Sequence, residues 1–461
     1  MLTNMKLVAP LLLILVCSAP GNSMSKQEDL PKDEFARRRA IFLEELRELN
    51  ACAVFHTAPM YPRNNDVEHP FRQDSDFYYL TGWPHRDALL MLTPQEDTEK
   101  GSEVTLFVAP RNLKMEVWTG PKKGVDEALT IPGVDQAYDY DILYDHLAKM
   151  ISGYDRLVIS YGANPEFKRE LDMHLEKSWT RPSITQEASA LLKSHRLIKS
   201  DYEIEALEKA ITITHQSFQD LLPLVPSMSY EYEAQAMIEY GFAKRGAERL
   251  GFPSIVGAGQ NATYLHYEDN RGVLNKGELL LLDIGAEWEY YSADISRTIP
   301  ISGRFSPEQR AIYELVLAAQ LAAIDKVEPG TSWRKPHDTA IQVITEGLVE
   351  LELLEGKIDT LIQTKAYRKF FMHGTSHWLG LDVHDAGGWL AENGKPHILK
   401  AGMVLTVEPG IYIKESEDVD PKWWNIGIRL EDDVLVTPKG HKVLSQNIPK
   451  TIDEIEGLMQ P

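Results

Sequence analysis

The run GELLLLDIGAEWEYYSADISRTIPI, residues 277–301, decides the fold of the second half of this chain. Its two ends are rich in apolar and β-branched residues, and a short polar stretch separates them. This pattern predicts two antiparallel strands joined by a tight turn around residues 287–290. A loop centred between Trp288 and Glu289 would place Asp283 and Asp294 directly opposite each other, with Cβ atoms about 5 Å apart.

Two carboxylates at that separation repel each other and lose hydration unless a positive group lies between them. A divalent metal ion would supply the positive charge. The hairpin alone leaves a second interpretation equally open, in which one acid is solvated in the turn and the other pairs with Arg297.

A cluster of histidines follows in FFMHGTSHWLGLDVHD, residues 370–385, which contains His373, His377 and His384, whereas the whole chain has 14 histidines. Imidazole is the commonest neutral metal ligand and a frequent proton carrier, so this density indicates the wall of an active site. Any one of the three, taken alone, is better explained as a core histidine. The cluster is not the HExxH zinc signature, because Gly374 stands where the Glu would be.

Two further acids end apolar strand-like runs. Glu408 closes MVLTVE, and Glu431 lies in IRLED with Arg429 on the same strand face. Charges seldom end apolar strands without a partner. Together with Asp283 and Asp294 these acids carry four negative charges, which two divalent cations would cancel while one neutral His adds a nitrogen ligand. Such oxygen-rich ligation suits Mn²⁺, Co²⁺ or Zn²⁺ in a dinuclear hydrolase, with metals about 3.5–4 Å apart.

Composition sets the wider limits. The 461 residues allow two or three domains at about 150 residues each. With 43% hydrophobic and 25% charged residues, the chain is an ordinary folded protein rather than a disordered or polytopic membrane one. The net charge of −21 repels a phosphate backbone and argues against nucleic acid as a partner. Cys17 and Cys52 are too few for a disulfide framework.

The chain divides near residue 200. Strand-like runs at 104–110 and 156–162 alternate with helical patterns and indicate an α/β unit. Ser200 and Glu203 then form a capping box, which predicts a new helix and a new domain.

Residues 1–23 admit two interpretations. The apolar stretch 7–19 has the length of a signal-peptide core and is too short to span a bilayer comfortably, but Lys6 is its only basic neighbour. A real leader would make the protein periplasmic or exported. We favour translation from Met24, which would make it cytoplasmic, and residues 1–23 do not enter the fold argument.

The acids and histidines, in their order and contexts, resemble the metal ligands of pita-bread-fold metallopeptidases, and most closely those of the Xaa-Pro aminopeptidases (aminopeptidase P). The likeness covers residues 33–458 and includes HPFRQDSDFYYLTGW at 69–83 and MEVWTGPKKG at 115–124. It implies an α/β fold class, with an N-terminal α/β domain over residues 24–195 followed by a pita-bread catalytic domain over 196–461, built of two pseudo-symmetric halves.

The resemblance also implies the roles of individual residues. The ligands of two metal ions would be Asp283, Asp294, His377, Glu408 and Glu431, with Asp294 and Glu431 bridging. His266, His373 and His384 would line the site, orient the substrate and stabilise the charge that develops on the scissile carbonyl oxygen. Arg429 would be a neighbouring or substrate contact, or else a structural partner of Glu431. Trp118 matches a position that can reach a neighbouring subunit's site, although we expect it to pack in the interior here.

The implied activity is release of the first residue from peptides with proline in second position, by attack of a metal-bridging hydroxide, with Mn²⁺ as the favoured ion. Glu408 would carry the proton to the proline nitrogen. A homo-oligomer without a stable membrane span is expected. Three alternatives remain: a prolidase, which shares these ligands and cleaves dipeptides only; a non-catalytic peptide- or histone-binding pita-bread protein; and a metal-free enzyme of the creatinase type.

Overall fold

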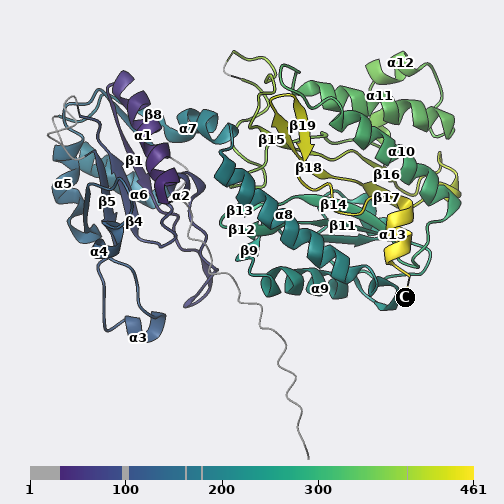
Figure 1. Ribbon diagram of the computed structural model, residues 1–461, viewed down its shortest axis with the longest axis horizontal. Helices are drawn as coiled ribbons and strands as arrows, with labels where there is room; N and C mark the ends of the chain where they lie inside the picture. Colours follow the sequence, from purple (N-terminus) through teal and green to yellow (C-terminus); the bar gives the residue numbers. More distant parts are fainter. Residues whose placement is uncertain (1–31, 96–102, 161–163, 178–179, 392, 461) are drawn as a thin grey trace, which may run out of the picture.

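The computed structural model describes residues 32–95, 103–160, 164–177, 180–391 and 393–460. Two domains lie side by side and are joined through helix α7 (Ala188–Leu197) (Figure 1). The interpretations of residues 1–23, Cys17 included, lie outside the described residues. No helix within these described ranges is long and apolar enough to cross a membrane.

The N-terminal domain is built on a six-stranded mixed sheet with the order β6-β5-β4-β1-β7-β8. Its strands are β1 (Ala51–His56), β4 (Ala88–Leu92), β5 (Val104–Val108), β6 (Gln136–Asp139), β7 (Arg156–Ile159) and β8 (Ile184–Glu187). The remaining elements are the ribbon of β2 (Pro62–Asn64) and β3 (Val67–Glu68) and helices α1 (Lys32–Glu48), α2 (Ser75–Thr81), α3 (Glu116–Thr119), α4 (Val125–Ala128), α5 (Leu143–Met150) and α6 (Pro165–Leu175).

Alternate residues of β1 enter two separate apolar clusters, as the twofold period of a strand requires. Ala53 and Phe55 pack with Phe42 of α1 on one face of the sheet. Cys52, a free thiol, and Val54 pack with α5 and α6 on the other. Helices therefore cover both faces, which is why the central strands are apolar along their whole length.

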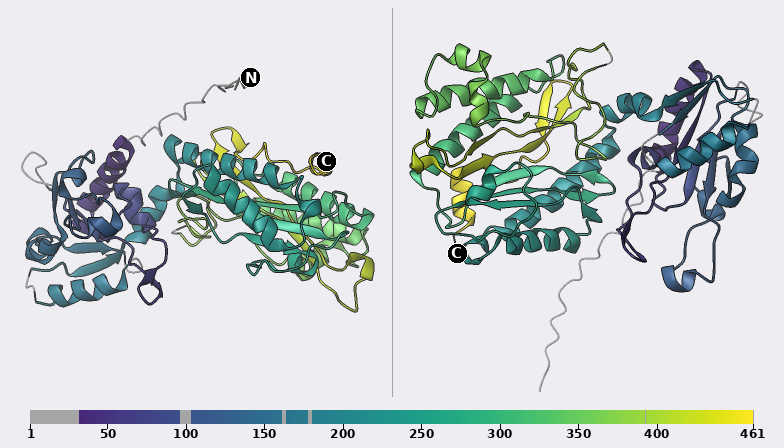
Figure 2. Two further views of the ribbon diagram at one scale, coloured as in Figure 1. Left: turned by 90° about the horizontal axis from the view of Figure 1, so that it is seen from below. Right: turned by 180° about the vertical axis from the view of Figure 1, so that it is seen from behind.

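The C-terminal domain consists of two αβ halves. The first contains α8 (Asp201–Leu221), α9 (Glu231–Lys244), β9 (Arg249–Leu250), β10 (Ile255–Ala258), β11 (Leu279–Ile284), β12 (Ala286–Trp288), β13 (Tyr291–Ser292) and β14 (Ile295–Pro300). The second contains α10 (Pro307–Ile324), α11 (Arg334–Glu350), α12 (Ile358–Gln363), β15 (Val404–Val407), β16 (Gly410–Ile413), β17 (Ile426–Arg429), β18 (Asp432–Thr437), β19 (Gly440–Val443) and α13 (Ile452–Leu458). Helices α8 and α9 run along one side and α10 and α11 along the other, with the strands between them (Figures 1 and 2).

The helix predicted after Ser200 is confirmed as α8. The Ser200 hydroxyl accepts a hydrogen bond from the Glu203 amide, and the Glu203 carboxylate accepts one from the Ser200 amide. Residues of both halves share one buried apolar cluster, to which β11 contributes Leu280 and Leu282. Since neighbouring residues of a strand point to opposite faces, Asp283 lies on the face of β11 away from that cluster.

The register predicted for the hairpin is wrong, because the centre of the turn lies one residue further along the chain than predicted. Asp283 pairs with Ser296, not with Asp294, because the turn is centred between Glu289 and Tyr290. Both turn residues have positive φ, 50° and 70°, which closes a two-residue loop of the kind that matches strand twist.

Arg297 does not pair with either hairpin acid. Its Nη2 lies 2.8 Å from Oδ1 of Asp432, and its guanidinium also donates to the backbone oxygens of Ser296 and Glu431. The interpretation in which Arg297 neutralises an acid of the hairpin is therefore wrong.

Gly285 allows the two limbs of the hairpin to approach, because a Cβ there would lie 1.9 Å from the backbone oxygen of Ala293. We expect Gly285→Ala to lower the free energy of unfolding by more than about 2 kcal/mol, since backbone cannot yield as a flexible side chain can. The control is Gly457→Ala in α13, where a Cβ meets nothing within 4 Å. It should be neutral or stabilising by up to about 1 kcal/mol. Urea unfolding followed by fluorescence measures the free energy of unfolding of both variants. Equal destabilisation by the two substitutions would contradict this account.

Candidate metal centre and active site

A cleft of about 540 Å³ opens in the C-terminal domain, and residues from distant parts of the sequence line it. All nine metal-site and wall residues proposed from the sequence are among them: His266, Asp283, Asp294, His373, His377, His384, Glu408, Arg429 and Glu431. The structure thus brings these candidates into a single site. Trp118 is not part of that lining.

The four acids come from strand ends, two from each half of the domain. Asp283 is the fifth residue of β11, and Asp294 directly precedes β14. Glu408 follows β15, and Glu431 lies between β17 and β18. Apolar strands carry each carboxylate to the cleft, where the two halves face each other.

His377 is held in an orientation that suits metal binding. Its amide donates to the Thr406 hydroxyl at 3.1 Å, and its carbonyl accepts from the Thr406 amide at 3.0 Å. The ring Nδ1 lies 3.1 Å from the backbone oxygen of Trp378, so Nδ1 carries the proton and Nε2 carries the lone pair. A carbonyl at Nδ1 is the usual outer partner of a ligating histidine.

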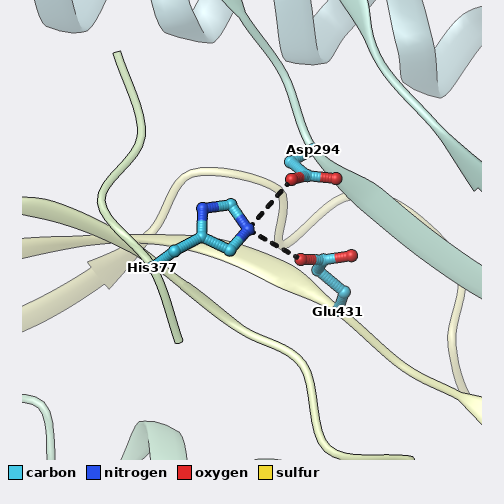
Figure 3. A group of neighbouring side chains, drawn as sticks. All are labelled: Asp294, His377 and Glu431. Atoms are coloured by element: carbon cyan, nitrogen blue, oxygen red, sulfur yellow. Dashed lines mark ion pairs between the residues drawn. The ribbon is translucent and has the colours of Figure 1, made fainter. Parts of the chain in front are cut away.

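The lone pair of His377 faces carboxylates rather than a donor. Nε2 lies 3.2 Å from Oδ2 of Asp294 and 4.0 Å from Oε1 of Glu431 (Figure 3). One ligand atom from each of these three residues falls within 4.8 Å of the others. A lone pair and two carboxylate oxygens directed at one point fit a cation.

Asp283 carries an unsatisfied oxygen. Its Oδ2 accepts a hydrogen bond from Nη2 of Arg429 at 2.6 Å, while Oδ1 is buried without a hydrogen-bond partner among the described residues. Such an atom is costly unless a ligand reaches it. The same contact corrects the structural alternative for Arg429, because its ion pair is with Asp283 and not with Glu431.

Burial and mutual repulsion hold the pKa of three of these acids above the usual range. Burial raises the pKa of Glu408 to about 7, although His377 and Arg429 lower it in part. Burial, followed by the charges of neighbouring carboxylates, raises the pKa of Asp294 and of Glu431 well above normal. The donor set of carboxylates and one imidazole nitrogen fits divalent metal ions, which would replace the protons.

A hydrogen-bonded chain forms one wall of the cleft. Nδ1 of His373 lies 2.6 Å from the Gly374 carbonyl and must donate to it, so Nε2 accepts from the Tyr412 hydroxyl at 2.9 Å. The same hydroxyl accepts from Nη1 of Arg429 at 3.0 Å. Burial and the Arg429 charge lower the pKa of His373 to about 3, so this imidazole is neutral.

Sequence reasoning missed part of the site. Tyr412 lies four residues after Glu408 in β16, and Ser296 donates to Oε2 of Glu431 at 2.8 Å. An aromatic and aliphatic wall was also missed: Phe252, Ile255, Leu265, Trp333, Trp378, Val383 and Trp389. Ser296 was within reach of the hairpin argument, since the true register sets it opposite Asp283. The apolar wall had no signal in the sequence.

Trp118 does not pack in the interior. It lies on α3 of the N-terminal domain with 83% of its surface exposed. The expectation of a buried packing role was therefore wrong, because the short helix α3 buries none of its residues.

Known proteins share this architecture throughout. The model of metallopeptidase family M24 matches residues 205–438, and that of the aminopeptidase P N-terminal domain matches residues 35–159. The Xaa-Pro aminopeptidase of Haemophilus influenzae is 40% identical over 430 residues, which cover 93% of this chain and 98% of that protein. The Xaa-Pro aminopeptidase of Escherichia coli is 36% identical over 438 residues, covering 94% and 98%.

The chain belongs to metallopeptidase family M24, among the Xaa-Pro aminopeptidases. The structure of aminopeptidase PepP from Pseudomonas aeruginosa superposes with a TM-score of 0.89 at 42% identity, covering 93% of this chain and 98% of that one. Zinc-substituted E. coli aminopeptidase P in complex with product gives a TM-score of 0.88 at 36% identity, covering 93% and 98%. The expected fold class, an N-terminal α/β domain followed by a pita-bread domain, is confirmed, and this M24 enzyme uses divalent metal ions.

Chelation should make the stability of this M24 enzyme strongly dependent on pH. In the chelated protein the folded pKa of Glu408 lies above its usual value of 4.5, at about 7, and burial and neighbouring carboxylates hold the pKa of Asp294 and of Glu431 well above their usual values. The folded state therefore binds more protons than the unfolded state, so its stability falls as pH rises from about 4.5 through 7 and beyond.

We expect the melting temperature measured with excess EDTA to fall between pH 5 and pH 8, and the metal-loaded protein to change much less. Melting curves at both pH values, with EDTA and with Mn²⁺, measure the difference in melting temperature between the metal-loaded and the chelated protein. If this difference in melting temperature stays constant or narrows as pH rises, the result would contradict a site built from repelling carboxylates.

Proposed function

We propose that this chain releases the N-terminal residue from peptides whose second residue is proline. The observation that supports it best is the set of four carboxylates and the His377 lone pair in one cleft with an apolar wall. The relatives in H. influenzae and E. coli are named Xaa-Pro aminopeptidases. An Xaa-Pro bond is a tertiary amide without an N–H, which a site made for ordinary peptides handles poorly.

The residues that would hold two divalent ions are Asp283, Asp294, His377, Glu408 and Glu431. Mn²⁺ is the favoured ion, because four of these five side chains offer oxygen. When bound, the ions polarise the scissile carbonyl and activate a water as nucleophile. Oδ1 of Asp283, which has no hydrogen-bond partner in the described part of the chain, supports the place of this residue in the set.

The chain's own side chains would handle the substrate and the proton. Glu408 has 18% of its side chain exposed to the cleft, and its oxygens lie 3.7 Å from ring nitrogens of both His373 and His377. A carboxyl group with this access can take a proton and pass it to the proline nitrogen. His266 and His384 would orient the peptide and stabilise the negative charge on the scissile oxygen. His373 is neutral and both of its ring nitrogens are already hydrogen-bonded, so it would help to position the peptide as part of the cleft wall.

Domain division and assembly belong to the same proposal. Helix α7 ends at Leu197 and α8 begins at Asp201, and this break supports a boundary within a few residues of the proposed division into a domain over residues 24–195 and a catalytic domain over 196–461. The exposed side chains around Trp118, with Leu113, Met115 and Val117 at least half exposed, support a homo-oligomer.

A comparison of two substrates separates the aminopeptidase from its rivals. We expect an Xaa-Pro-Xaa tripeptide to be cleaved after its first residue, with loss of activity on chelation and recovery on addition of Mn²⁺. Amino-acid release from the tripeptide and from an Xaa-Pro dipeptide is measured side by side. Cleavage of the dipeptide alone would identify a prolidase, metal-free cleavage would favour the creatinase type, and no cleavage would favour a binding protein.

Replacing the proposed proton carrier gives a second test. Glu408→Ala should lower kcat on the tripeptide by at least a thousandfold, because both a ligand and a proton acceptor are removed. The control Glu417→Ala changes an exposed acid outside the cleft lining and should leave kcat unchanged. Metal content is measured on both variants. A Glu408→Ala enzyme with its metal retained and substantial turnover would remove this role.

A further inference from the structure

The loop of residues 378–385 follows His377 and carries His384, and the rings of these two histidines are in contact. His377 directly precedes the loop, His384 is its last residue but one, and their rings meet edge to face with centroids 4.4 Å apart. Among the described residues the ring of His384 has no hydrogen-bond partner. Its orientation therefore depends on the backbone on either side of it and on the His377 ring.

The loop is closed by a backbone hydrogen bond whose acceptor is shared with His377. The amide of Asp385 donates to the backbone oxygen of Trp378 at 2.9 Å, and the same oxygen receives Nδ1–H of His377. Any displacement of Asp385 therefore moves its neighbour His384 and also disturbs the bond that orients His377.

Asp385 is anchored by buried charges that lie outside the catalytic cleft. Its carboxylate has 1% of its surface exposed and accepts from Nη2 of Arg196 and from Nζ of Lys199, the latter at 2.7 Å. Nη2 of Arg196 also lies 2.7 Å from Oδ2 of Asp382, in the same loop. Nη1 of Arg196 donates to Oδ1 of Asp76 at 2.8 Å.

This guanidinium joins three parts of the molecule. Arg196 lies in α7, the helix between the domains, and Asp76 lies in α2 of the N-terminal domain. Ser75 of α2 donates directly to Oδ1 of Asp382 at 2.6 Å, and Nη2 of Arg72 reaches the Leu381 oxygen at 2.5 Å. The N-terminal domain thus contacts the loop through residues that do not line the cleft.

The loop is closely packed against the charges that anchor it. A Cβ at Gly380 would lie 2.2 Å from Oδ2 of Asp385 and 2.9 Å from Cε of Lys199. Three carboxylates share the Arg196 side chain, of which 6% is exposed. A planar fork with fixed donors can serve several acceptors at once, whereas a lysine ammonium offers one point of charge.

We propose that Arg196 is a positioning residue for His384, and that through it the N-terminal domain sets the geometry of the catalytic cleft. This inference rests on the proposed function, because it assumes that His384 acts on an Xaa-Pro peptide. Arg196 itself is not among the residues that line the cleft and acts on it only through the loop.

The test is a double-mutant cycle on the metal-loaded, full-length enzyme with an Xaa-Pro-Xaa tripeptide. Arg196→Lys should lower kcat at least fivefold with KM and metal content within twofold of the unmodified enzyme. In the His384→Ala background the same substitution should change kcat by less than twofold, since the residue through which Arg196 acts is gone.

Arg38→Lys is the matched control. Arg38 is also buried and also crosses the domain boundary, with Nη2 3.1 Å from the Tyr291 hydroxyl and 3.4 Å from Oε2 of Glu203, but it does not touch the 378–385 loop. Any loss that it causes through weaker domain contact should be the same in both backgrounds.

An equal loss from Arg196→Lys in both backgrounds would overturn the inference and leave Arg196 a purely structural residue. If Arg196→Lys does not yield a folded enzyme, Asp382→Asn takes its place in the cycle, because its side chain is 41% exposed and tolerates substitution more readily. A full kcat for His384→Ala would likewise overturn the inference. Failure of the unmodified enzyme to cleave the tripeptide is a distinct result, because it overturns the proposed function itself.

Discussion

Mutual repulsion between four carboxylates in one buried cleft constrains everything around them. Arg429 is the only Arg or Lys among the described residues that line the cleft, and it reaches Asp283. Removing so much like charge from water costs several kcal/mol per ion unless a counter-charge replaces the water. The surrounding groups are arranged accordingly: His377 turns its lone pair inward, and Ser296 donates to the outer oxygen of Glu431. The fold holds the acids in place, and the cations compensate their charge.

The two αβ halves explain how such a cluster can be held. Each half delivers two acids at the ends of strands, so no single element carries the whole charge. Arg297 joins the halves behind the ligands, since its guanidinium donates to the backbone oxygens of Ser296 and Glu431 and pairs with the fully buried Asp432. In addition, the Glu431 amide donates to the Ser296 oxygen at 3.1 Å. The segments that carry Asp294 and Glu431 are thereby fixed to each other independently of any metal.

Chemistry was easier to predict from this sequence than geometry. Acids that end apolar strands and a histidine-rich loop stand out locally, and all of them reach the cleft. The predicted hairpin register was wrong because Glu289 and Tyr290 adopt positive φ without being Gly or Asn, so the usual sequence signal for the turn was absent. The predicted ion-pair partners of Arg297 and Arg429 were wrong for another reason. Buried charges pair across tertiary contacts, and the nearest acid in the sequence is a poor guide to them.

The contact between the domains could not be predicted from the sequence, although the residues that the N-terminal domain contributes to it, Arg72, Ser75 and Asp76, stand in the stretch 69–83 that suggested the resemblance. Arg196 and Asp382 are 186 positions apart, and no local pattern relates them. A domain that only restricted access to the cleft could meet the catalytic domain through any apolar surface. Here buried charges converge on the 378–385 loop, while Tyr78 stacks on Tyr290 of the hairpin turn with ring centroids 3.8 Å apart.

These contacts reach both segments on which the site depends, the histidine loop and the hairpin that carries Asp283 and Asp294. Buried ion pairs are costly to desolvate and add little net stability, so their value lies in the single geometry that they permit. The N-terminal domain is therefore better understood as part of the framework that shapes the catalytic cleft than as a cover laid over a finished site.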